Sequence, residues 1–281
     1  MSRSVGEALT DLRGRLTAAG IENPAREARL IVAAALGIGH DRVGVMQPDP
    51  LPEPAEDHLS AMAARRCGRE PLSHILGLRA FYEHEFRVTS DVLDPRPETE
   101  VLVRAALAVP FERVMDLGTG SGCILLSMLA ERPNALGVGT DVSEAALTVA
   151  AENAERLGLA QRVTMKVSDW FEQVEGCFDL IVSNPPYIAA ADMAALDPEL
   201  TYEPRVALTD EADGLTAYRA IVAAAPTFLN PKGWLMVETG WTQGPQVAVL
   251  FQEAGFESVK ILPDLDGRDR VVQGCMRHEA K

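Results

Sequence analysis

The sequence has no apolar stretch that approaches the roughly 18 uncharged residues of a membrane-spanning helix. Its first residues, Met1 to Glu7, also lack the apolar core of a signal peptide. We therefore expect a cytoplasmic protein without a membrane segment. With 281 residues, 47% of them hydrophobic and 24% charged, the chain has the composition of a globular protein with a substantial core.

Cysteine and histidine are scarce, and neither occurs in a pattern typical of metal sites. No C-x-x-C pair occurs, and no histidine lies at ligand spacing from a cysteine. The four cysteines are Cys67, Cys123, Cys177 and Cys275, and the five histidines are His40, His58, His74, His84 and His278. We expect reduced, mostly buried thiols and no metal.

Basic side chains are also few, since 26 Lys and Arg face 41 Asp and Glu, for a net charge of −15. This balance argues against a protein that binds nucleic acid directly by neutralising phosphates. Residues 1–90 hold 11 Arg, no Lys and 12 acidic residues, so the acidity belongs to the rest of the chain. It can serve solubility, or it can form an acidic face that attracts a basic protein partner.

The region from about residue 4 to 75 reads as short helices in a small bundle. A first apolar face recurs at helical spacing, and Asn23-Pro24 caps and starts a second helix that ends near Gly37. A proline-rich turn covers Pro48 to Pro54, and a further helix is expected over His58 to Arg69. Residues 78–89 read as a hairpin or an extended connector. The first face consists of Val5, Leu9, Leu12 and Leu16.

From about Glu98 the pattern changes to alternating strands and helices, which indicates an α/β fold with a mainly parallel sheet. The expected strands are Arg113–Asp116, Leu136–Asp141, Arg162–Val167, Phe178–Ser183, Gly233–Glu238, Ser258–Leu262 and Arg270–Cys275. The expected helices are Cys123–Glu131, Glu144–Leu157, Leu215–Leu229 and Pro245–Ala254. We predict a helical domain over residues 1–76, a connector over 77–97 and an α/β domain over 98–281.

A glycine-rich loop follows the first of these strands. The strand ends at Asp116 and Leu117, and the loop reads Gly118, Thr119, Gly120, Ser121, Gly122. Glycines let a backbone approach a ligand closely and present amide donors at a helix N-terminus. A dinucleotide fingerprint would place glycine where Cys123 stands, so the loop favours S-adenosylmethionine over NAD.

Two further features follow at the ends of the next strands. Asp141 lies about 20 residues beyond the loop, where a carboxylate can bind both ribose hydroxyls. Asp169 and Trp170 follow the third strand and can bound an adenine ring. Each feature alone is more often structural, but strand ends of this kind meet at one edge of an α/β sheet. Together they predict a cofactor site.

The tetrapeptide Asn184-Pro185-Pro186-Tyr187 follows an apolar strand and is suited to hold a planar NH2 group. The Asn184 side-chain oxygen and the Pro185 carbonyl can each accept one N–H, and Tyr187 can stack on the plane of the group. Pro185 and Pro186 stiffen the backbone. Orientation then carries much of the catalysis, without a general base. The tetrapeptide itself does not choose between an amide and an adenine.

These residues resemble those of the bacterial release-factor glutamine methyltransferases, the HemK-like or PrmC family, over nearly the whole chain. The matching segments are Asp94 to Glu100, Asp116 to Gly122, Ser168 to Phe171, Val182 to Tyr187, Tyr202 to Leu208 and Glu238 to Trp241. The family usually has an apolar residue where Asp94 stands, which leaves the local packing open.

The resemblance implies a seven-stranded Rossmann-like methyltransferase domain preceded by a helical domain that binds the substrate protein. It implies methylation of the glutamine side-chain amide in the Gly-Gly-Gln motif of class I release factors. We expect the protein to be a monomer. Gly118 to Gly122, Asp141, Trp170 and Asn184 would line the cofactor, and Asn184 to Tyr187 would hold the glutamine. Arg96 and Glu98 would shape the mouth of the site or form an ion pair at the domain junction.

Two alternatives stay open. One is methylation of a glutamine in a large-subunit ribosomal protein, although the related enzymes resemble Pro-Arg-Ser-Pro where this chain has Pro95 to Glu100. The other is adenine-N6 methylation of nucleic acid, which would need base flipping and a basic groove. The acidity of the chain counts against the second.

Overall fold

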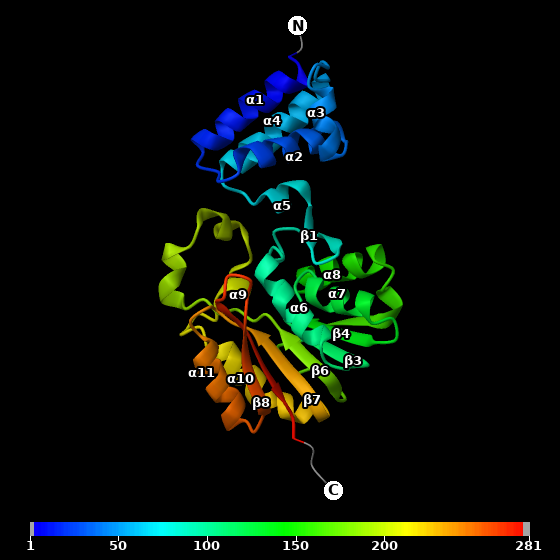
Figure 1. Cartoon of the computed structure of the whole chain (residues 1–281), viewed down its shortest axis with the longest axis vertical. Coiled ribbons are helices and arrows are strands. Elements are labelled where there is room, and N and C mark those ends of the chain that lie inside the picture. The colour runs from blue at the N-terminus through cyan, green and yellow to red at the C-terminus, as the bar shows by residue number, and fades with distance from the viewer. Residues whose placement is uncertain (1–2, 278–281) are drawn as a thin grey trace. The chain divides into compact units, whose positions relative to one another are not determined.

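The computed structural model describes residues 3–277 and divides into two compact units, each shown in Figure 1. The helical unit contains the described residues up to Gly77 together with Asp197–Tyr202. The sheet unit contains Leu78–Leu196 and the described residues from Glu203 onward, including residues 78–97 of the segment expected as a separate connector. The outermost positions of the predicted domains, residues 1–2 and 278–281, lie outside the described residues.

The helical unit is a bundle of short helices around an aliphatic core. Ser4 starts the first helix with a capping box, because its hydroxyl accepts from the Glu7 N–H at 3.2 Å and its own N–H donates to the Glu7 carboxylate at 2.7 Å. Of the expected face, Leu9 is only partly buried, and the other three residues are buried in the core. The helices are α1 (Val5–Ala18), α2 (Pro24–Leu36), α3 (Val43–Met46), α4 (Glu53–Cys67) and α5 (Leu72–Leu76).

Two details of this unit differ from the expectation. Asn23 occupies the N-cap position of α2, but its side chain accepts no capping hydrogen bond. The helix expected from His58 begins instead at Glu53, and it ends at Cys67. Pro54 lies in its first turn, where a missing N–H costs nothing because those N–H groups have no partner within the helix.

The sheet unit contains a seven-stranded mixed sheet in the order β5-β4-β3-β6-β7-β9-β8. The first five strands in this order are parallel neighbours, and β9 is antiparallel to both β7 and β8. The strands are β3 (Arg113–Leu117), β4 (Leu136–Asp141), β5 (Val163–Val167), β6 (Phe178–Ser183), β7 (Leu229–Glu238), β8 (Glu257–Pro263) and β9 (Asp269–Cys275). The expected strands all occur, with ends that shift by a few residues.

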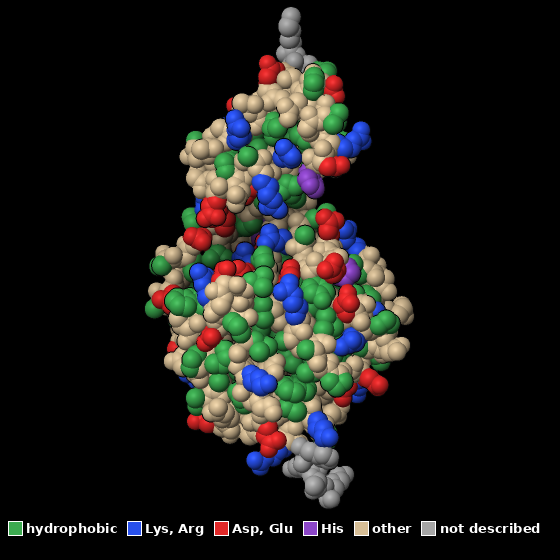
Figure 2. Space-filling view, viewed as in Figure 1, with side chains coloured by type: hydrophobic (Ala, Val, Ile, Leu, Met, Phe, Trp, Pro, Cys, Tyr) green, Lys and Arg blue, Asp and Glu red, His purple; other side chains and the backbone are tan. Residues whose placement is uncertain are grey.

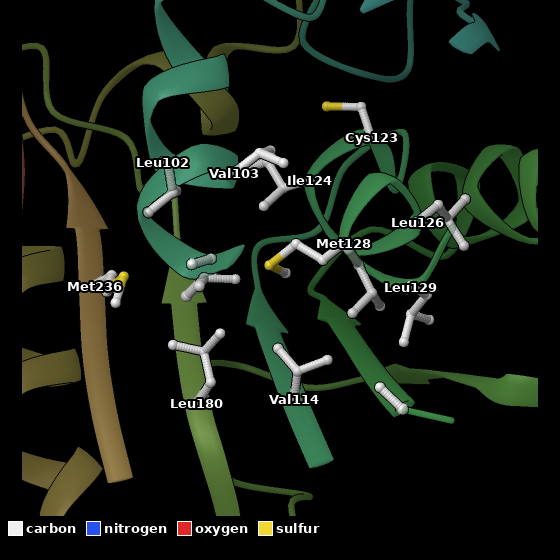
Figure 3. Packing of buried hydrophobic residues seen from close by; sticks show 14 of the residues in the cluster. Leu102, Val103, Val114, Cys123, Ile124, Leu126, Met128, Leu129, Leu180 and Met236 are labelled. Carbon is white, nitrogen blue, oxygen red and sulfur yellow. The ribbon is translucent and has the colours of Figure 1, made fainter. Parts of the chain in front are cut away.

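Helices cover both faces of this sheet, as Figure 1 shows. Val114 and Leu180 point to the face covered by α6 and α7, and Figure 3 shows this packing. Their neighbours Met115 and Ile181 point to the opposite face, against α10 and α11. This alternation follows from the two-residue repeat of a strand. The helices are α6 (Glu100–Leu107), α7 (Cys123–Glu131), α8 (Glu144–Arg156), α9 (Arg205–Leu208), α10 (Thr216–Phe228) and α11 (Gly244–Glu253).

Residues 78–87 form an antiparallel hairpin, β1 (Leu78–Phe81) and β2 (His84–Arg87). The hairpin is tied to α8, because Asn153 Oδ1 accepts from the Arg87 N–H at 2.7 Å and Asn153 Nδ2 donates to the Arg87 carbonyl at 3.0 Å. Beyond it, Val88 and Val92 pack against residues of α8. This packing places the segment 91–99 beside the ends of the central strands.

Between residues 3 and 277, no helix is long and apolar enough to cross a membrane. The same residues contain no group of three or more His, Cys, Asp or Glu side chains that could hold a metal ion.

Candidate functional site

The glycine-rich loop and the tetrapeptide follow neighbouring strands. β3 and β6 are parallel, with Leu117 opposite Ser183 in the register. β4, which follows β3 in the chain, lies on one side of this pair, and β7, which follows β6, lies on the other side. The order in which strands are added to the sheet therefore changes direction between β3 and β6. Open α/β sheets bind ligands at such a switch point, outside the carboxyl ends of the strands.

The loop after β3 depends on glycine. Gly118, Gly120 and Gly122 have φ values of 68°, 55° and 79°, a left-handed conformation that other residues adopt only with strain. The turn is closed by the Gly122 N–H, which donates to the Thr119 carbonyl at 2.8 Å. Helix α7 then begins at Cys123, so the loop sits at a helix N-terminus as expected.

Two carboxylates support this loop. Asp141 accepts from the Gly120 N–H at 2.9 Å through Oδ2 and from the Ser143 N–H at 3.0 Å through Oδ1. Burial raises the pKa of Asp141. Asp116 is fully buried and accepts from the Thr119 hydroxyl at 2.7 Å. Burial, partly offset by that hydrogen bond, raises the pKa of Asp116 to about 7.

The Trp170 side chain lies next to Gly118. A Cβ atom placed on Gly118 would lie 3.9 Å from Cζ3 of the Trp170 ring. The indole is held by a tight turn in which Trp170 itself has a φ of 45°. Ser168 stabilises this turn, because its hydroxyl donates to the Trp170 carbonyl at 2.9 Å and accepts from the Gln173 N–H at 3.0 Å.

These features line one cavity of about 300 Å³, within the range of ligand pockets. From the predicted cofactor residues it includes Gly118, Thr119, Gly120, Ser121, Asp141, Trp170 and Asn184, and from the predicted substrate residues also Pro186. Gly122, Pro185 and Tyr187 are not among its lining residues. Gly122 instead packs its backbone against Leu126 and Ala150, where a Cβ would lie 3.0 Å from the Leu126 side chain.

The lining fits S-adenosylmethionine. Glycine backbone offers close approach, Asp141 has carboxylate lone pairs left after its two backbone contacts, and the Trp170 indole offers an apolar wall. When bound, the cofactor would be held by residues 118–121 of the loop, Asp141 and Trp170.

The tetrapeptide is anchored at both ends. Before it, the Ser183 hydroxyl donates to the Leu117 carbonyl at 2.7 Å, which ties it to β3. At its end, Gln243 Nε2 donates to the Tyr187 carbonyl at 3.0 Å. Between these anchors, Asn184 Nδ2 donates to Thr99 Oγ1 at 3.4 Å. Burial raises the pKa of Tyr187 to about 12, so its ring stays neutral.

Arg96 lines the cavity and pairs with carboxylates other than the expected one. Its guanidinium forms a short ion pair with the buried Glu203 and lies 3.8 Å from Asp94. The structure gives no ion pair between Arg96 and Glu98 among the described residues, so that alternative is wrong. Asp94 is buried because Arg79, at 3.6 Å, and Arg96 compensate its charge.

Several lining residues carry no signal that sequence reasoning could use. They come from the segment before α6, from the start of α7, from the turn after β4 and from the segment 204–207 around α9. The additional lining residues include Val92, Leu93, Thr99, Cys123, Ile124, Val142, Ser143, Pro204, Val206 and Ala207. The segment 202–208 could be found only through the family resemblance.

Comparisons with known proteins agree with this geometry. Residues 7–77 match the family described as the PrmC N-terminal domain, and residues 110–262 match a methyltransferase domain family. A release factor glutamine methyltransferase of Cereibacter sphaeroides is 54% identical over 259 residues, covering 92% of this chain and 93% of the relative. The corresponding protein of Rhodospirillum rubrum is 48% identical over 261 residues, covering 91% of this chain and 80% of the relative.

The crystal structure of a methyltransferase from Pyrococcus furiosus superposes with a TM-score of 0.53 at 19% identity, covering 68% of this chain and 88% of that chain. This likeness concerns the fold. The predicted α/β methyltransferase fold is thereby confirmed. The match to the methyltransferase domain family and the relatives confirm the predicted use of S-adenosylmethionine. The chain belongs to the family of release factor glutamine methyltransferases.

Proposed function

We propose that this protein methylates the side-chain amide nitrogen of the glutamine in the Gly-Gly-Gln motif of class I release factors. The observation that carries the proposal is the placement of Asn184 in the same cavity as the glycine-rich loop. An acceptor for an NH2 group thus lies beside the cofactor residues. The names of the relatives, which match this chain over most of its length, support glutamine as the bearer of that group.

The tetrapeptide acts by orientation. Asn184 Oδ1 accepts one N–H of the glutamine amide, the Pro185 carbonyl accepts the other, and Tyr187 stacks on the amide plane. When bound, S-adenosylmethionine supplies a methyl group whose carbon–sulfur bond breaks as the substrate nitrogen bonds to the methyl carbon. The two acceptors stabilise the positive charge that grows on the nitrogen, which finally releases one of its protons to solvent water.

The rigidity of these acceptors has a structural source. Pro185 is buried, and the hydrogen bonds of Ser183 and Gln243 hold the backbone on either side of it. Because the carbonyl of Pro185 needs no reorganisation when substrate binds, its dipole contributes fully in the transition state. The catalytic roles of Asn184, Pro185 and Tyr187 are part of this proposal.

We also propose that the enzyme acts on the release factor as a monomer in the cytoplasm, without binding nucleic acid directly. The net charge of −15 supports this, because an acidic protein is poorly suited to bind phosphates. On the face seen in Figure 2, the Lys and Arg side chains of the sheet unit are spread among acidic and apolar ones.

A substrate panel tests the proposal. The purified protein is incubated with isotope-labelled S-adenosylmethionine and, separately, with a class I release factor, the same factor with its Gly-Gly-Gln glutamine replaced by alanine, large-subunit ribosomal proteins, and adenine-containing DNA. We expect label only in the unaltered factor. Label in ribosomal protein or DNA, with the factor unlabelled, would overturn the assignment.

A further inference from the structure

Two segments that resemble the family, Pro97 to Glu100 and Glu238 to Trp241, have no part in the chemistry above. The structure brings one residue of each beside the tetrapeptide. Thr99 ends a 3₁₀ turn, Pro97–Thr99, just before α6, and Glu238 is the last residue of β7. β6 and β7 are parallel with Ser183 opposite Val237, so the next residues, Asn184 and Glu238, leave the two strands side by side.

These residues follow one another in a line. Asn184 Nδ2 donates to Thr99 Oγ1 at 3.4 Å, and the Thr99 side chain in turn lowers the pKa of the neighbouring Glu238 carboxyl. Thr99 is 2% exposed and Glu238 is 1% exposed, so bulk water does not compete for these groups. Thr99 also lines the cavity.

The chain of hydrogen bonds has a direction. Above its pKa of about 7 the Glu238 carboxyl is ionised and can only accept, so the single proton of the Thr99 hydroxyl is then directed at Glu238. Toward Asn184, the Thr99 oxygen then presents only lone pairs. It can therefore accept a hydrogen bond from Asn184 but cannot donate one to it. The Asn184 amide must therefore turn its NH2 toward Thr99 and its Oδ1 away from it.

We propose that Thr99 is a positioning residue that sets the orientation of the Asn184 amide, with Glu238 as the acceptor that fixes the direction of the Thr99 hydroxyl. The inference rests on the proposed function, in which Asn184 Oδ1 accepts an N–H of the substrate. With the amide reversed, Asn184 would present an NH2 group to the NH2 group of the substrate. Two donors cannot pair, so the reversed amide would repel the substrate group that it has to hold.

Other charged and titratable groups around Glu238 are consistent with this role. Burial raises the pKa of Glu238 and Glu98 acts in the same direction, whereas Arg270 and Arg96 favour its ionised form. Arg270 is itself buried, and its Nη1 donates to the carbonyl of Thr239 at 3.3 Å, next to Glu238. Tyr187, the stacking residue, also lies within electrostatic reach of Glu238. Glu238 thus lies within electrostatic reach of both the tetrapeptide and the buried Arg270.

The test uses the full-length protein and a release factor, with Thr99→Val, Thr99→Ser and Glu238→Gln. Valine keeps the shape of threonine without the hydroxyl, and serine keeps the hydroxyl. Glutamine can donate to Thr99 and so reverses the direction of the hydrogen bonds. Turnover, the KM for the factor, and the affinity for S-adenosylmethionine by calorimetry are measured for each. Thr148→Val, an exposed threonine of α8, is the matched control.

We expect Thr99→Val to lower kcat about tenfold, the effect of losing one hydrogen bond, with the cofactor affinity changed less than about twofold. Thr99→Ser should retain most of the wild-type kcat. Glu238→Gln should lower kcat, as Thr99→Val does. In an Asn184→Ala background, Thr99→Val should have almost no further effect, because it acts through Asn184.

Three outcomes would overturn the inference. One is wild-type turnover by Thr99→Val. Another is that Thr99→Val lowers turnover by the same factor in the Asn184→Ala background as in the wild-type protein. The third is a loss of cofactor affinity that accounts for the fall in turnover, since Thr99 would then only shape the cofactor cavity. Methylation by the wild-type protein distinguishes a failure of this inference from a failure of the proposed function. Absence of factor methylation by the wild type contradicts the proposed function itself, whereas wild-type methylation with an unaffected Thr99→Val contradicts only the role of Thr99.

Discussion

Replacing Glu238 by glutamine is expected to stabilise the sheet unit increasingly as the pH rises. Burial, opposed by the Thr99 hydrogen bond and by Arg270, raises the pKa of Glu238 from 4.5 to about 7. Because the folded-state pKa lies above the unfolded one, the stability associated with the neutral carboxyl is present below pH 4.5 and is lost as the pH rises through 7. The difference between the two pKa values corresponds to about 3 kcal/mol.

Glutamine has nearly the same shape and stays neutral, so Glu238→Gln should not show this loss. Its free energy of unfolding relative to the wild type should increase by about 3 kcal/mol between pH 4.5 and 8, most of it before pH 7. A constant offset from altered hydrogen bonding does not affect this change with pH. The expectation applies to protein without cofactor.

Urea unfolding followed by tryptophan fluorescence is a suitable assay. All three tryptophans, Trp170, Trp234 and Trp241, belong to the sheet unit, so the signal reports on that unit alone. Glu155→Gln, at an exposed position of α8, is the control and should show no comparable trend with pH. A stability difference between Glu238→Gln and the wild type that stays flat from pH 5 to 8 would refute the burial argument.

Three other substitutions have distinct expected outcomes. Asn184→Ala should lower turnover about 100-fold, the scale of a lost transition-state hydrogen bond, while calorimetry still detects cofactor binding; unchanged turnover would refute its acceptor role. Gly118→Ala should cost about 1 kcal/mol in urea unfolding, because φ is 68° there, and should weaken cofactor binding beside Trp170; wild-type values of both would contradict the need for glycine. Asp141→Ala removes the acceptor of the Gly120 and Ser143 N–H groups and should weaken cofactor binding at least about tenfold by calorimetry, whereas unaltered affinity would exclude a role in the cavity.

Much of the sheet could be predicted from the sequence, because its parallel strands are short apolar runs bounded by turns. Phe178–Ser183 is an example whose limits agree in sequence and structure. Helix α6 was not predicted as an element, although its residues 100–107 have an apolar face, since it directly follows a proline-rich segment that reads as a connector. The early start of α4 shows the same difficulty, because Pro54 reads as a turn residue and yet lies within the helix.

The site could be predicted wherever its residues follow strand ends, since topology brings such ends together. Gly118, Asp141, Trp170 and Asn184 all follow this rule, and all line the same cavity. The partners of these residues could not be predicted. Arg96 pairs with Glu203 and Asn184 with Thr99, across separations of 107 and 85 residues, and neither pair has a local spacing that would reveal it.

Tandem mass spectrometry of a class I release factor, after incubation with this protein and S-adenosylmethionine, tests the central claim most directly. The account predicts one added methyl group, located on the side chain of the Gly-Gly-Gln glutamine, with wild-type protein and almost none with Asn184→Ala. A methyl group on any other residue, or an unmodified glutamine after incubation with active wild-type protein, would contradict it.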